Sequence, residues 1–434
     1  MPAPRTRYAI VGLGSRARTY TRALLGPYRE RGELVGLCDS NSLRVDWHNQ
    51  SFADDFDIAP IPGYGAEEFS RMLRDQRVGA VIVTSVDSTH HRYVVDALRA
   101  GCNVITEKPL TIDAARGQEI VDAVKETGRQ VTVAFNYRYA PRNARLKELL
   151  NEGAIGTVLS IHFEWLLDTQ HGADYFRRWH RDKGNSGGLM VHKASHHFDL
   201  LNWWLRARPV TVFGFGRLAF YGRENAVRRG VTALYERAHG APEAEADPFG
   251  LRLEADPVLK GLYLDAESED GYLRDRGVFS DGITIEDDIA LVIRYSTGVA
   301  VSYHLTAYSP WEGYRVAFNG TEGRLELDAV ERSFVRRPAD GATGRPPTNL
   351  VRVAIRPHWR EPVEIDLSPD EDDGGHSGAD TAMLAALFGD GAAADPLQRG
   401  SSYVDGVLAI LPGIGANLSF DSGRAVDLTR LVRF

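Results

Sequence analysis

The chain has 434 residues, of which 43% are hydrophobic and 25% charged, and this length and balance indicate a soluble globular protein with two domains of comparable size. Its net charge of -8 gives no basic field for nucleic acid, and no apolar run approaches the length of a membrane span, so we expect neither nucleic acid nor a membrane as a partner. Two cysteines, Cys38 and Cys102, lie far apart in apolar contexts and imply neither a disulfide framework nor a zinc cluster.

Short apolar runs alternate with helical segments over residues 7–135. The runs cover residues 8–12, 34–38, 80–84, 103–106 and 131–135. Strand and helix in alternation predict a parallel sheet with helices on both faces. The first run starts so close to Met1 that no room is left for a signal peptide, and we therefore expect a cytoplasmic protein.

The first turn of this predicted sheet has the sequence Gly12-Leu13-Gly14-Ser15-Arg16-Ala17, a GxGxxA form of the dinucleotide fingerprint. It follows a strand and opens a predicted helix over residues 18–25, and Asp39 ends the second strand 22 residues after Ala17. In this context the glycines let the backbone approach a diphosphate at a helix N-terminus, while Asp39 binds the adenosine ribose.

The residue at position 39 also bears on the choice of cofactor. A carboxylate there would repel a 2′-phosphate, so the sequence favours NAD over NADP. Ser40, Asn41 and Arg44 follow, however, and would form a phosphate site if Asp39 turned away, so NADP stays open.

Two polar segments end at the same edge of the predicted sheet. Residues 84–91, which run from Thr84 and Ser85 to His90 and His91, follow the fourth strand, and we expect them to border the nucleotide. Capping of the next helix is an equal interpretation of the histidines. The fifth strand ends in Thr106-Glu107-Lys108-Pro109, where a lysine reaches the nicotinamide end and a cis bond before the proline would fix its direction.

The stretch 187–199 follows a glycine pair with a cluster of titratable side chains. If it is one helix, His192 and His196 lie four residues apart on one face, with Asp199 three residues further along. Single histidines on apolar helices are usually structural. Several within two turns, with Lys193 among them, favour an active site.

The remainder of the chain predicts a second sheet interrupted by an insertion. Residues 217–282 form a charge-rich insertion in which we expect short helices and assign no chemistry. Alternation over residues 289–295, 299–305, 314–318 and 323–327 predicts an antiparallel meander. Helices are predicted at 380–388 and 401–416.

Together these motifs resemble the Gfo/Idh/MocA family of nicotinamide-dependent sugar and inositol oxidoreductases. The resemblance rests on the GLGSRAR turn, on EKP at 107–109, on FNYRYAP at 135–141 and on the glycine pair followed by HxxD at 196–199. It implies an α/β protein with a Rossmann dinucleotide-binding domain over residues 1–135. Residues 136–434 would form an α/β domain with a large open, mainly antiparallel sheet, which commonly serves for homodimer or homotetramer formation.

The resemblance places the family's catalytic lysine at Lys108 and its catalytic histidine at His196. An aspartate usually lies four residues before that histidine, and this chain has His192 instead, which can also donate a hydrogen bond, carry a proton or bind an anion. We expect the nucleotide to contact Gly12, Gly14, Ser15, Arg16, Asp39, Thr84, Ser85, His90, Glu107, Lys108 and Asn136. We expect the substrate to contact Lys108, Tyr139, Trp179, His180, His192, Lys193 and His196.

Our hypothesis is hydride transfer between NAD and a secondary hydroxyl of a sugar, cyclitol or glycoside, with Lys108, His196 and His192 as catalytic residues. An alternative is NAD-dependent glycoside hydrolysis by transient oxidation, elimination, hydration and re-reduction, in which His192, Lys193, His196 and His197 supply proton carriers. A nucleotide-binding regulator without catalysis is a third interpretation. His192 and His196 have the spacing of a zinc-binding helix, but Lys193 stands where metalloproteases have glutamate, so we expect no metal.

Overall fold

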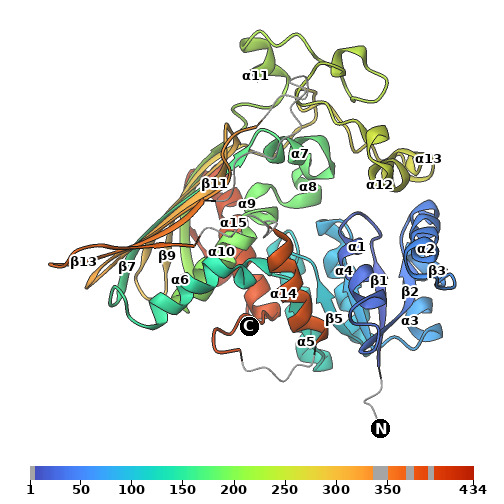
Figure 1. The fold of residues 1–434 in the computed structure, drawn as a ribbon, viewed down its shortest axis with the longest axis horizontal. Coiled ribbons are helices and arrows are strands. Elements are labelled where there is room, and N and C mark those ends of the chain that lie inside the picture. Colours follow the sequence, from blue (N-terminus) through green and yellow to red (C-terminus); the bar gives the residue numbers. More distant parts are fainter. Residues whose placement is uncertain (1–4, 336–349, 368–375, 390–394) are drawn as a thin grey trace.

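Two sheets of different kinds organise the chain in the computed structural model, which describes residues 5–335, 350–367, 376–389 and 395–434. A six-stranded sheet comes first and a nine-stranded sheet follows (Figure 1). The largest apolar cluster runs from the first sheet to the inner face of the second. The two domains therefore share a continuous core.

The first sheet is a parallel Rossmann sheet, as the alternation of strand and helix predicts. Its strands are β1 (Thr6–Val11), β2 (Gly32–Cys38), β3 (Gly63–Tyr64), β4 (Ala80–Val83), β5 (Asn103–Thr106) and β6 (Val131–Val133). They lie in the order β3-β2-β1-β4-β5-β6, and every neighbouring pair is parallel. The two-residue strand β3 is too short to produce a periodic signal and was missing from the prediction.

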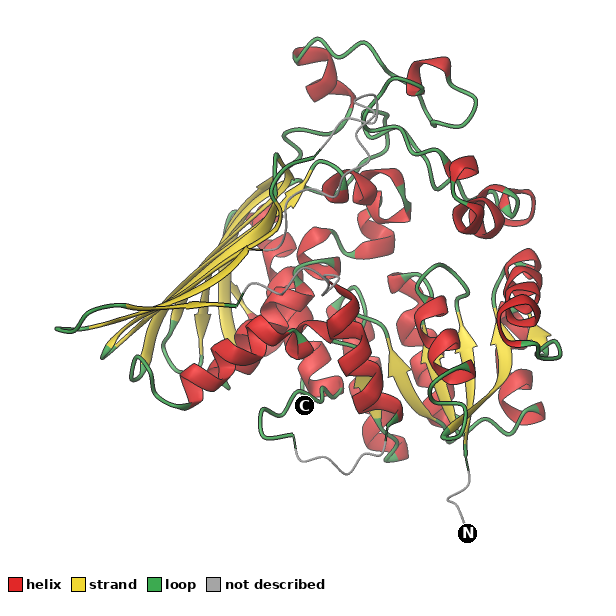
Figure 2. Ribbon diagram, viewed as in Figure 1, coloured by secondary structure: helices red, strands yellow, loops and turns green. Residues whose placement is uncertain are grey.

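Helices cover both faces of this sheet (Figure 2). They are α1 (Ala17–Leu25), α2 (Ser42–Phe56), α3 (Phe69–Asp75), α4 (His90–Arg99) and α5 (Ala114–Thr127). Local signals set several of their ends. Asn41 caps α2 by accepting from the amide of Leu43, and Asp113 caps α5 by accepting from the amide of Arg116.

The second sheet has the order β14-β13-β12-β11-β7-β10-β9-β8-β15. Its strands are β7 (Val158–Asp168), β8 (Pro209–Arg217), β9 (Asp288–Tyr295), β10 (Ala300–Ser309), β11 (Glu312–Gly320), β12 (Gly323–Arg332), β13 (Leu350–Pro357), β14 (Val363–Asp366) and β15 (Val426–Asp427). The predicted simple meander is wrong at one point, because β7 lies between β10 and β11 and runs parallel to β10. Alternation identifies a strand and its buried face but does not identify its neighbours.

Helices cover only one face of this sheet, and its other face is open (Figure 2). The covering helices include α6 (Pro141–Asn151), α10 (Ser195–Leu205) and α15 (Tyr403–Ser422), whereas α14 (His376–Phe388) packs against α1 of the Rossmann domain and the segment 136–139. By length and composition α15 is apolar enough to cross a membrane, but 61% of its most apolar window is buried, and it packs against β8, α9 and α10. It is therefore a core helix of this fold.

The stretch 187–199 is not one continuous helix, which corrects the prediction. Gly187 and Gly188 have φ values of 70° and 79°, and the chain then forms α9 (Leu189–His192) and α10, with a break at residues 193–194. A Cβ at Gly413 of α15 would come within 2.2 Å of the carbonyl of Met190, so α15 packs directly on the backbone of α9. His192 ends one helix, and His196 lies in the first turn of the next.

Residues 217–282 leave the sheet after β8 and return at β9. They contain α11 (Arg223–Arg228), α12 (Pro257–Leu259), the π-helical turn η7 (Lys260–Leu264) and α13 (Glu267–Asp270). Between β7 and α9 lie α7 (His171–Arg177), η4 (Trp179–Arg181) and α8 (Lys183–Ser186). In Figure 1 the insertion extends from the upper end of the second sheet to α2 of the Rossmann domain.

The guanidinium of Arg138, in η3 (Asn136–Tyr139), joins three segments of the second domain. It donates to both carboxylate oxygens of Asp199 in α10, at 2.6 and 2.8 Å, and to Asp405 in α15, at 2.9 Å. The side chains of Arg138 and Asp199 are only 3% and 1% exposed, whereas Asp405 is 35% exposed. Asp199 is therefore a structural partner and does not lie beside the two histidines in the site.

We expect Asp199→Asn to lower the free energy of unfolding by about 3 kcal/mol, because the substitution leaves a buried guanidinium without its main counter-charge. Denaturant unfolding followed by tryptophan fluorescence measures the change. Asp405→Asn is the control, and its half-exposed carboxylate should contribute less than about 1 kcal/mol. Equal effects of the two substitutions would contradict this account.

Candidate active site

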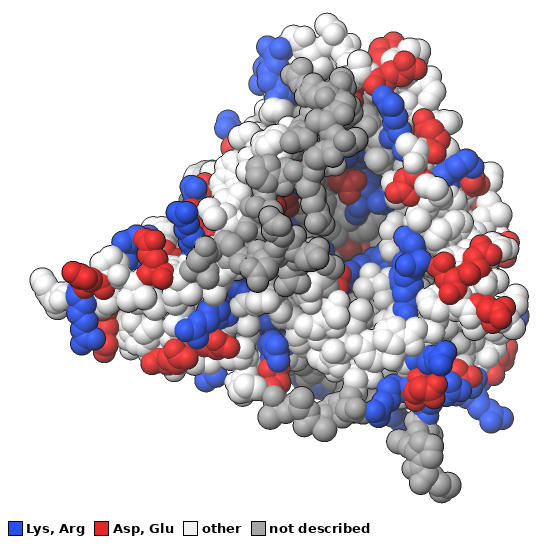
Figure 3. Space-filling model, in the orientation of Figure 1, with Lys and Arg blue, Asp and Glu red and all other residues white. Residues whose placement is uncertain are grey.

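A cavity of about 760 Å³ lies where the carboxyl edge of the Rossmann sheet meets α7, η4, α9, α10 and the insertion. In Figure 3 a recess between the insertion and the Rossmann domain displays both basic and acidic side chains. Sixteen of the site residues predicted from the sequence line this cavity, namely Gly12, Gly14, Ser15, Arg16, Asp39, Thr84, Ser85, His90, Glu107, Lys108, Asn136, Trp179, His180, His192, Lys193 and His196. Tyr139 does not line it. Its ring packs against the apolar cluster that includes Ile10 of β1, and the ring centroid lies 5.2 Å from the guanidinium carbon of Arg399.

The nucleotide end of the cavity is built around the turn between β1 and α1. Gly12 has a φ of 87°, and a Cβ there would come within 2.4 Å of the backbone of Ser85, so this position requires glycine. Asp39 accepts from the amide of Leu13 at 2.6 Å and pairs with Arg44 at 3.3 Å. The turn and the carboxylate are therefore held in one rigid unit.

A second group of charges connects this turn to the end of β5. Arg16 pairs with Glu107 at 2.5 Å and with Asp380 of α14 at 2.7 Å. Glu107 also accepts from the hydroxyl of Tyr20 at 2.7 Å, and Asp380 accepts from the side-chain amide of Asn136 at 2.9 Å. The network brings α1, β5, η3 and α14 together at the wall of the cavity.

The loop after β4 borders the cavity but uses much of its hydrogen-bonding capacity internally. Thr84 donates to the carbonyl of Gly12 at 2.5 Å, which links β4 to the glycine turn. The ring nitrogens of His90 face the carbonyls of Pro109 at 2.8 Å and Ser85 at 3.1 Å. His90 thus bonds to two loop carbonyls, and no described side chain caps the start of α4, so the structure does not support helix capping as its role. The Lys108–Pro109 bond is cis, as the sequence analysis anticipated.

The centre of the cavity contains a chain of three titratable groups from two domains. Nδ1 of His192 lies 2.5 Å from Oδ2 of Asp87, and its Nε2 lies 3.5 Å from Nζ of Lys108. Burial lowers the pKa of His192 well below its ordinary value, and the charge of Lys108 adds to this effect. Burial also lowers the pKa of Lys108, although Asp87 opposes the shift. His192 is therefore a neutral imidazole at neutral pH, oriented by Asp87.

A second group lies beside this chain. The ring of His196 stacks on Tyr137 at 4.2 Å, and the hydroxyl of Tyr137 accepts from Nζ of Lys193 at 3.0 Å. Burial lowers the pKa of Lys193 to about 8, a shift that the charge of Glu312 opposes. Lys193 is thus a group of the cavity that can exchange a proton near neutral pH.

The wall facing Lys108 combines aromatic surface with a guanidinium. Trp179 stacks on His180 with ring centroids 3.5 Å apart, and the ring of His180 lies 4.2 Å from that of His192. Arg178 donates to His180 at 3.1 Å and pairs with Asp174. Burial and the neighbouring arginine keep the pKa of His180 well below its ordinary value. This wall offers a flat apolar face edged by hydrogen-bonding groups.

His197 does not belong to the site. It is fully buried, its ring stacks on Trp165 at 3.9 Å, and its Nδ1 lies 2.7 Å from the hydroxyl of Tyr303. The proton-carrying cluster considered for a glycosidase thus loses this member. Adjacent residues of a helix point in different directions, so only His196 of this pair faces the cavity.

The structure adds cavity residues that the sequence did not single out. Asp87 stood within the polar loop 84–91, so its chemistry was visible but its partner was not. Others come from segments distant in sequence, namely Tyr137, Asp174, Tyr175, Tyr263, Tyr272, Arg274 and Asp380. Asp380 lies in α14. Tyr263, Tyr272 and Arg274 belong to the insertion, to which the sequence analysis assigned no chemistry.

These residues fit a dinucleotide. The carboxylate of Asp39 after β2, the glycine turn after β1 and the lysine at the end of β5 line one cavity in that order along the sheet edge. The buried Oδ1 of Asn136 has no hydrogen-bond partner among the described residues, as expected for an acceptor that receives a ligand donor. Within the same residues, no group of three or more His, Cys, Asp or Glu side chains has the geometry of a metal site.

Comparison with known proteins agrees with both domains. Residues 6–135 match the GFO_IDH_MocA oxidoreductase family with its NAD-binding Rossmann fold, and residues 147–343 match the C-terminal alpha/beta domain of that family. A crystal structure of an oxidoreductase domain protein from Kribbella flavida has the same fold, with a TM-score of 0.65 and 17% identity over 98% of this chain and 100% of that chain.

Two relatives extend the comparison at the sequence level. The chain is 33% identical over 404 residues to YteT of Bacillus subtilis (strain 168), whose name gives it a provisional place among oxidoreductases, and the match covers 89% of each protein. It is 26% identical over 207 residues to scyllo-inositol 2-dehydrogenase (NAD(+)) of the same bacterium, which covers 44% of this chain and 56% of that enzyme. The chain therefore belongs to the Gfo/Idh/MocA oxidoreductase family.

Proposed function

We propose that the protein oxidises, or in reverse reduces, a secondary alcohol of a sugar or cyclitol with NAD as the hydride carrier. One observation carries the proposal. Lys108, at the carboxyl end of β5, lies in the same cavity as the glycine turn, His192 and His196, so nucleotide and substrate groups converge on one wall. This is the arrangement that hydride transfer requires.

The chemistry supplied by the bound nicotinamide is acceptance of a hydride from the carbinol carbon. His196 accepts the proton of the reacting hydroxyl, a role for which imidazole is the usual choice. Lys108 donates a hydrogen bond to the same oxygen and stabilises the developing alkoxide. Because its pKa is lowered by burial, Lys108 also exchanges its proton more readily than an exposed lysine.

Because His192 is kept neutral, its ring can accept a hydrogen bond, as the aspartate usual at this position does. With its Nδ1 hydrogen directed at Asp87, Nε2 becomes an acceptor for a substrate hydroxyl or for Lys108. A carboxyl group, that of Asp87, is therefore still present, but His192 lies between it and the substrate. In this role His192 either binds a hydroxyl next to the reacting carbon or serves as a second proton carrier.

A polyol ring fits the wall opposite Lys108. The stacked rings of Trp179 and His180 offer an apolar face for the C–H side of a sugar or cyclitol, and the surrounding polar groups can bind its hydroxyls. The relative named scyllo-inositol 2-dehydrogenase supports this substrate class. Asp39 and its pairing with Arg44 support NAD over NADP, and a cytoplasmic location stays a prediction.

Glycoside hydrolysis with no net redox change is the second candidate. It needs proton carriers for elimination and hydration in addition to the base of the first oxidation step. Lys193, with a pKa of about 8, and the dyad formed by His192 and Asp87 would meet that need. The two candidates share their first step and differ in whether NADH accumulates.

An assay with NAD and a panel of free sugars, inositols and chromogenic glycosides separates the candidates. We expect net NADH without aglycone release, and release of the aglycone without net NADH would favour the hydrolase. Lys108→Ala and His196→Ala should each lower kcat by about 10²-fold or more, because both act on the reacting oxygen, and His196→Ala should leave NADH binding unchanged. Retained turnover in both variants would refute these roles, and failure on every polyol would support a regulator.

The orienting role of Asp87 has its own test. Asp87→Asn should lower kcat by about 10²-fold, because the imidazole loses the acceptor that fixes its tautomer. The tautomer is read from the nitrogen chemical shifts of the His192 ring, which should change from those of one tautomer to those of a mixture in Asp87→Asn. Asp87→Glu should keep a single tautomer. A fall in kcat with an unchanged tautomer in Asp87→Asn would reduce Asp87 to structural support.

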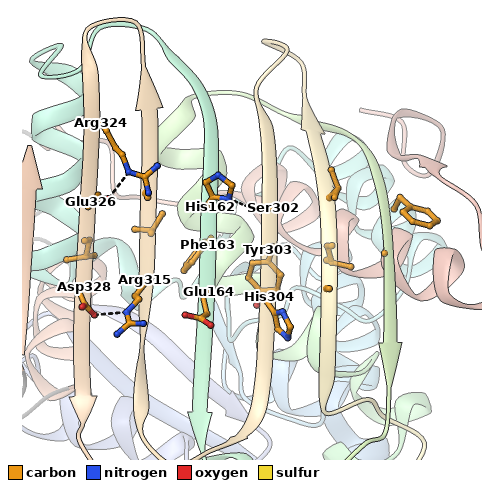
Figure 4. A pocket seen from close by; sticks show the side chains of 18 of the residues that line it. His162, Phe163, Glu164, Ser302, Tyr303, His304, Arg315, Arg324, Glu326 and Asp328 are labelled. Atoms are coloured by element: carbon orange, nitrogen blue, oxygen red, sulfur yellow. Dashed lines mark hydrogen bonds and ion pairs between the residues drawn. The ribbon is translucent and has the colours of Figure 1, made fainter. Parts of the chain in front are cut away.

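The open face of the second sheet supports a homodimer or homotetramer. A shallow pocket of about 730 Å³ runs across this face from β8 to β12 (Figure 4). Phe215 and Val292 on one side are 68% and 56% exposed, while the ion pairs of Arg315 with Asp328 and of Arg324 with Glu326 lie on the other. A second copy related by a two-fold axis would cover the apolar side.

Phe215→Asp combined with Val292→Asp should reduce the molar mass in solution to that of one chain, since charges would be buried in the contact. Size-exclusion chromatography with light scattering gives the mass. Val227→Asp is the matched control, because Val227 is 61% exposed on α11, away from the sheet. An unchanged mass in the double variant would place the contact elsewhere.

A further inference from the structure

The segment 257–275 of the insertion, which we call the clasp, is bonded to the nucleotide side of the Rossmann domain. Nε of Arg44 donates to the carbonyl of Leu262 at 3.0 Å, and the side-chain amide of Asn41 donates to the carbonyl of Ala266 at 2.8 Å. Figure 1 places α12 and α13, which belong to the clasp, beside α2. These contacts hold the clasp over the loop that follows β2, where the adenosine ribose is expected.

One clasp side chain reaches the glycine turn itself. The hydroxyl oxygen of Tyr263 accepts from the amide of Ser15 at 2.8 Å and lies 3.0 Å from the hydroxyl of Ser15. A Cβ at Gly14 would lie only 3.1 Å from that oxygen. Amides at the start of a helix are donors that a bound phosphate uses, so the tyrosine hydroxyl stands in the position of a phosphate oxygen.

A guanidinium lies directly behind this tyrosine. The central carbon of Arg274 is 4.2 Å from the ring centroid of Tyr263, and the side chain lines the cavity. Its Nε is buried and has no hydrogen-bond partner among the residues that the structure describes. Tyr272 and Asp174 interact with the rest of the guanidinium, but a buried Nε–H without an acceptor is costly unless a ligand supplies one. The natural acceptor at this position is an anion.

We propose that the clasp supplies the second half of a diphosphate site, in which Tyr263 and Arg274 donate to the diphosphate oxygens of the bound dinucleotide. The backbone amides of the glycine turn bind the same group from the Rossmann side. When the nucleotide enters, the hydroxyl of Tyr263 changes from acceptor of the Ser15 amide to donor toward a phosphate oxygen. The inference rests on nucleotide binding by the Rossmann domain and not on the reaction proposed above.

The test compares ligands that contain the diphosphate with one that lacks it. NADH binding is measured by its fluorescence, and ADP-ribose and adenosine are measured by displacement of NADH. Tyr263→Phe should weaken NADH and ADP-ribose about fivefold and Arg274→Gln about tenfold or more, because each variant loses a hydrogen bond to an anion. Adenosine should bind each variant within about twofold of the unaltered protein, since its contacts lie elsewhere.

Matched controls lie in the same insertion. Tyr235→Phe removes a hydroxyl that donates to Asp247 and does not line the cavity, and Arg276→Gln removes an exposed guanidinium two residues after Arg274. Neither should change nucleotide affinity, and thermal unfolding checks that every variant is folded. Unchanged NADH and ADP-ribose binding in both test variants would overturn the proposal, and so would an equal loss of adenosine affinity. Tighter binding in Tyr263→Phe would show that the hydroxyl competes with the nucleotide, which also overturns it.

Discussion

The contact between Asp87 and His192 is the interaction on which the site depends. Asp87 follows the fourth strand of the Rossmann sheet and His192 ends a helix of the second domain, so this hydrogen bond spans the boundary between the two domains. Because Lys108 faces the other ring nitrogen, the contact also fixes the distance between the nucleotide side and the substrate side. A shift of one domain against the other would break the chain of three groups, which makes the continuous core functionally important.

Around this centre the cavity is lined by titratable groups that are either paired with an opposite charge or kept neutral by burial. Arg16 and Arg44 are paired with carboxylates at the nucleotide end, whereas burial keeps His192 and His180 neutral at the substrate end. The insertion completes the enclosure with Tyr263 and Arg274. Burial of these groups lowers the local dielectric, which strengthens each electrostatic contact among them.

Much of the fold was predictable because its signals are local. The glycine turn, the carboxylate after the second strand and the parallel strands arise within short segments, where sequence spacing fixes geometry. The same logic failed where partners are distant in sequence. The position of β7 inside the second sheet depends on which strands meet, and the break between α9 and α10 depends on how α15 packs against the glycine pair and Met190. Tyr139 was expected at the substrate but packs in the apolar cluster instead.

The sequence by itself determined the Rossmann domain, its dinucleotide fingerprint and the two residue types, lysine and histidine, that meet the substrate oxygen in the proposed reaction. The domain and its fingerprint are encoded by neighbours within a turn or a strand, whereas the roles of the lysine and the histidine follow from the resemblance to the family. Only the tertiary structure decided that Asp87 orients His192, that Asp199 is buried with Arg138, and that Tyr263 bonds to Ser15 across 248 positions of sequence. These are pairings of groups that are unremarkable alone. Their chemistry appears only when burial removes water and leaves each polar group with one specific partner.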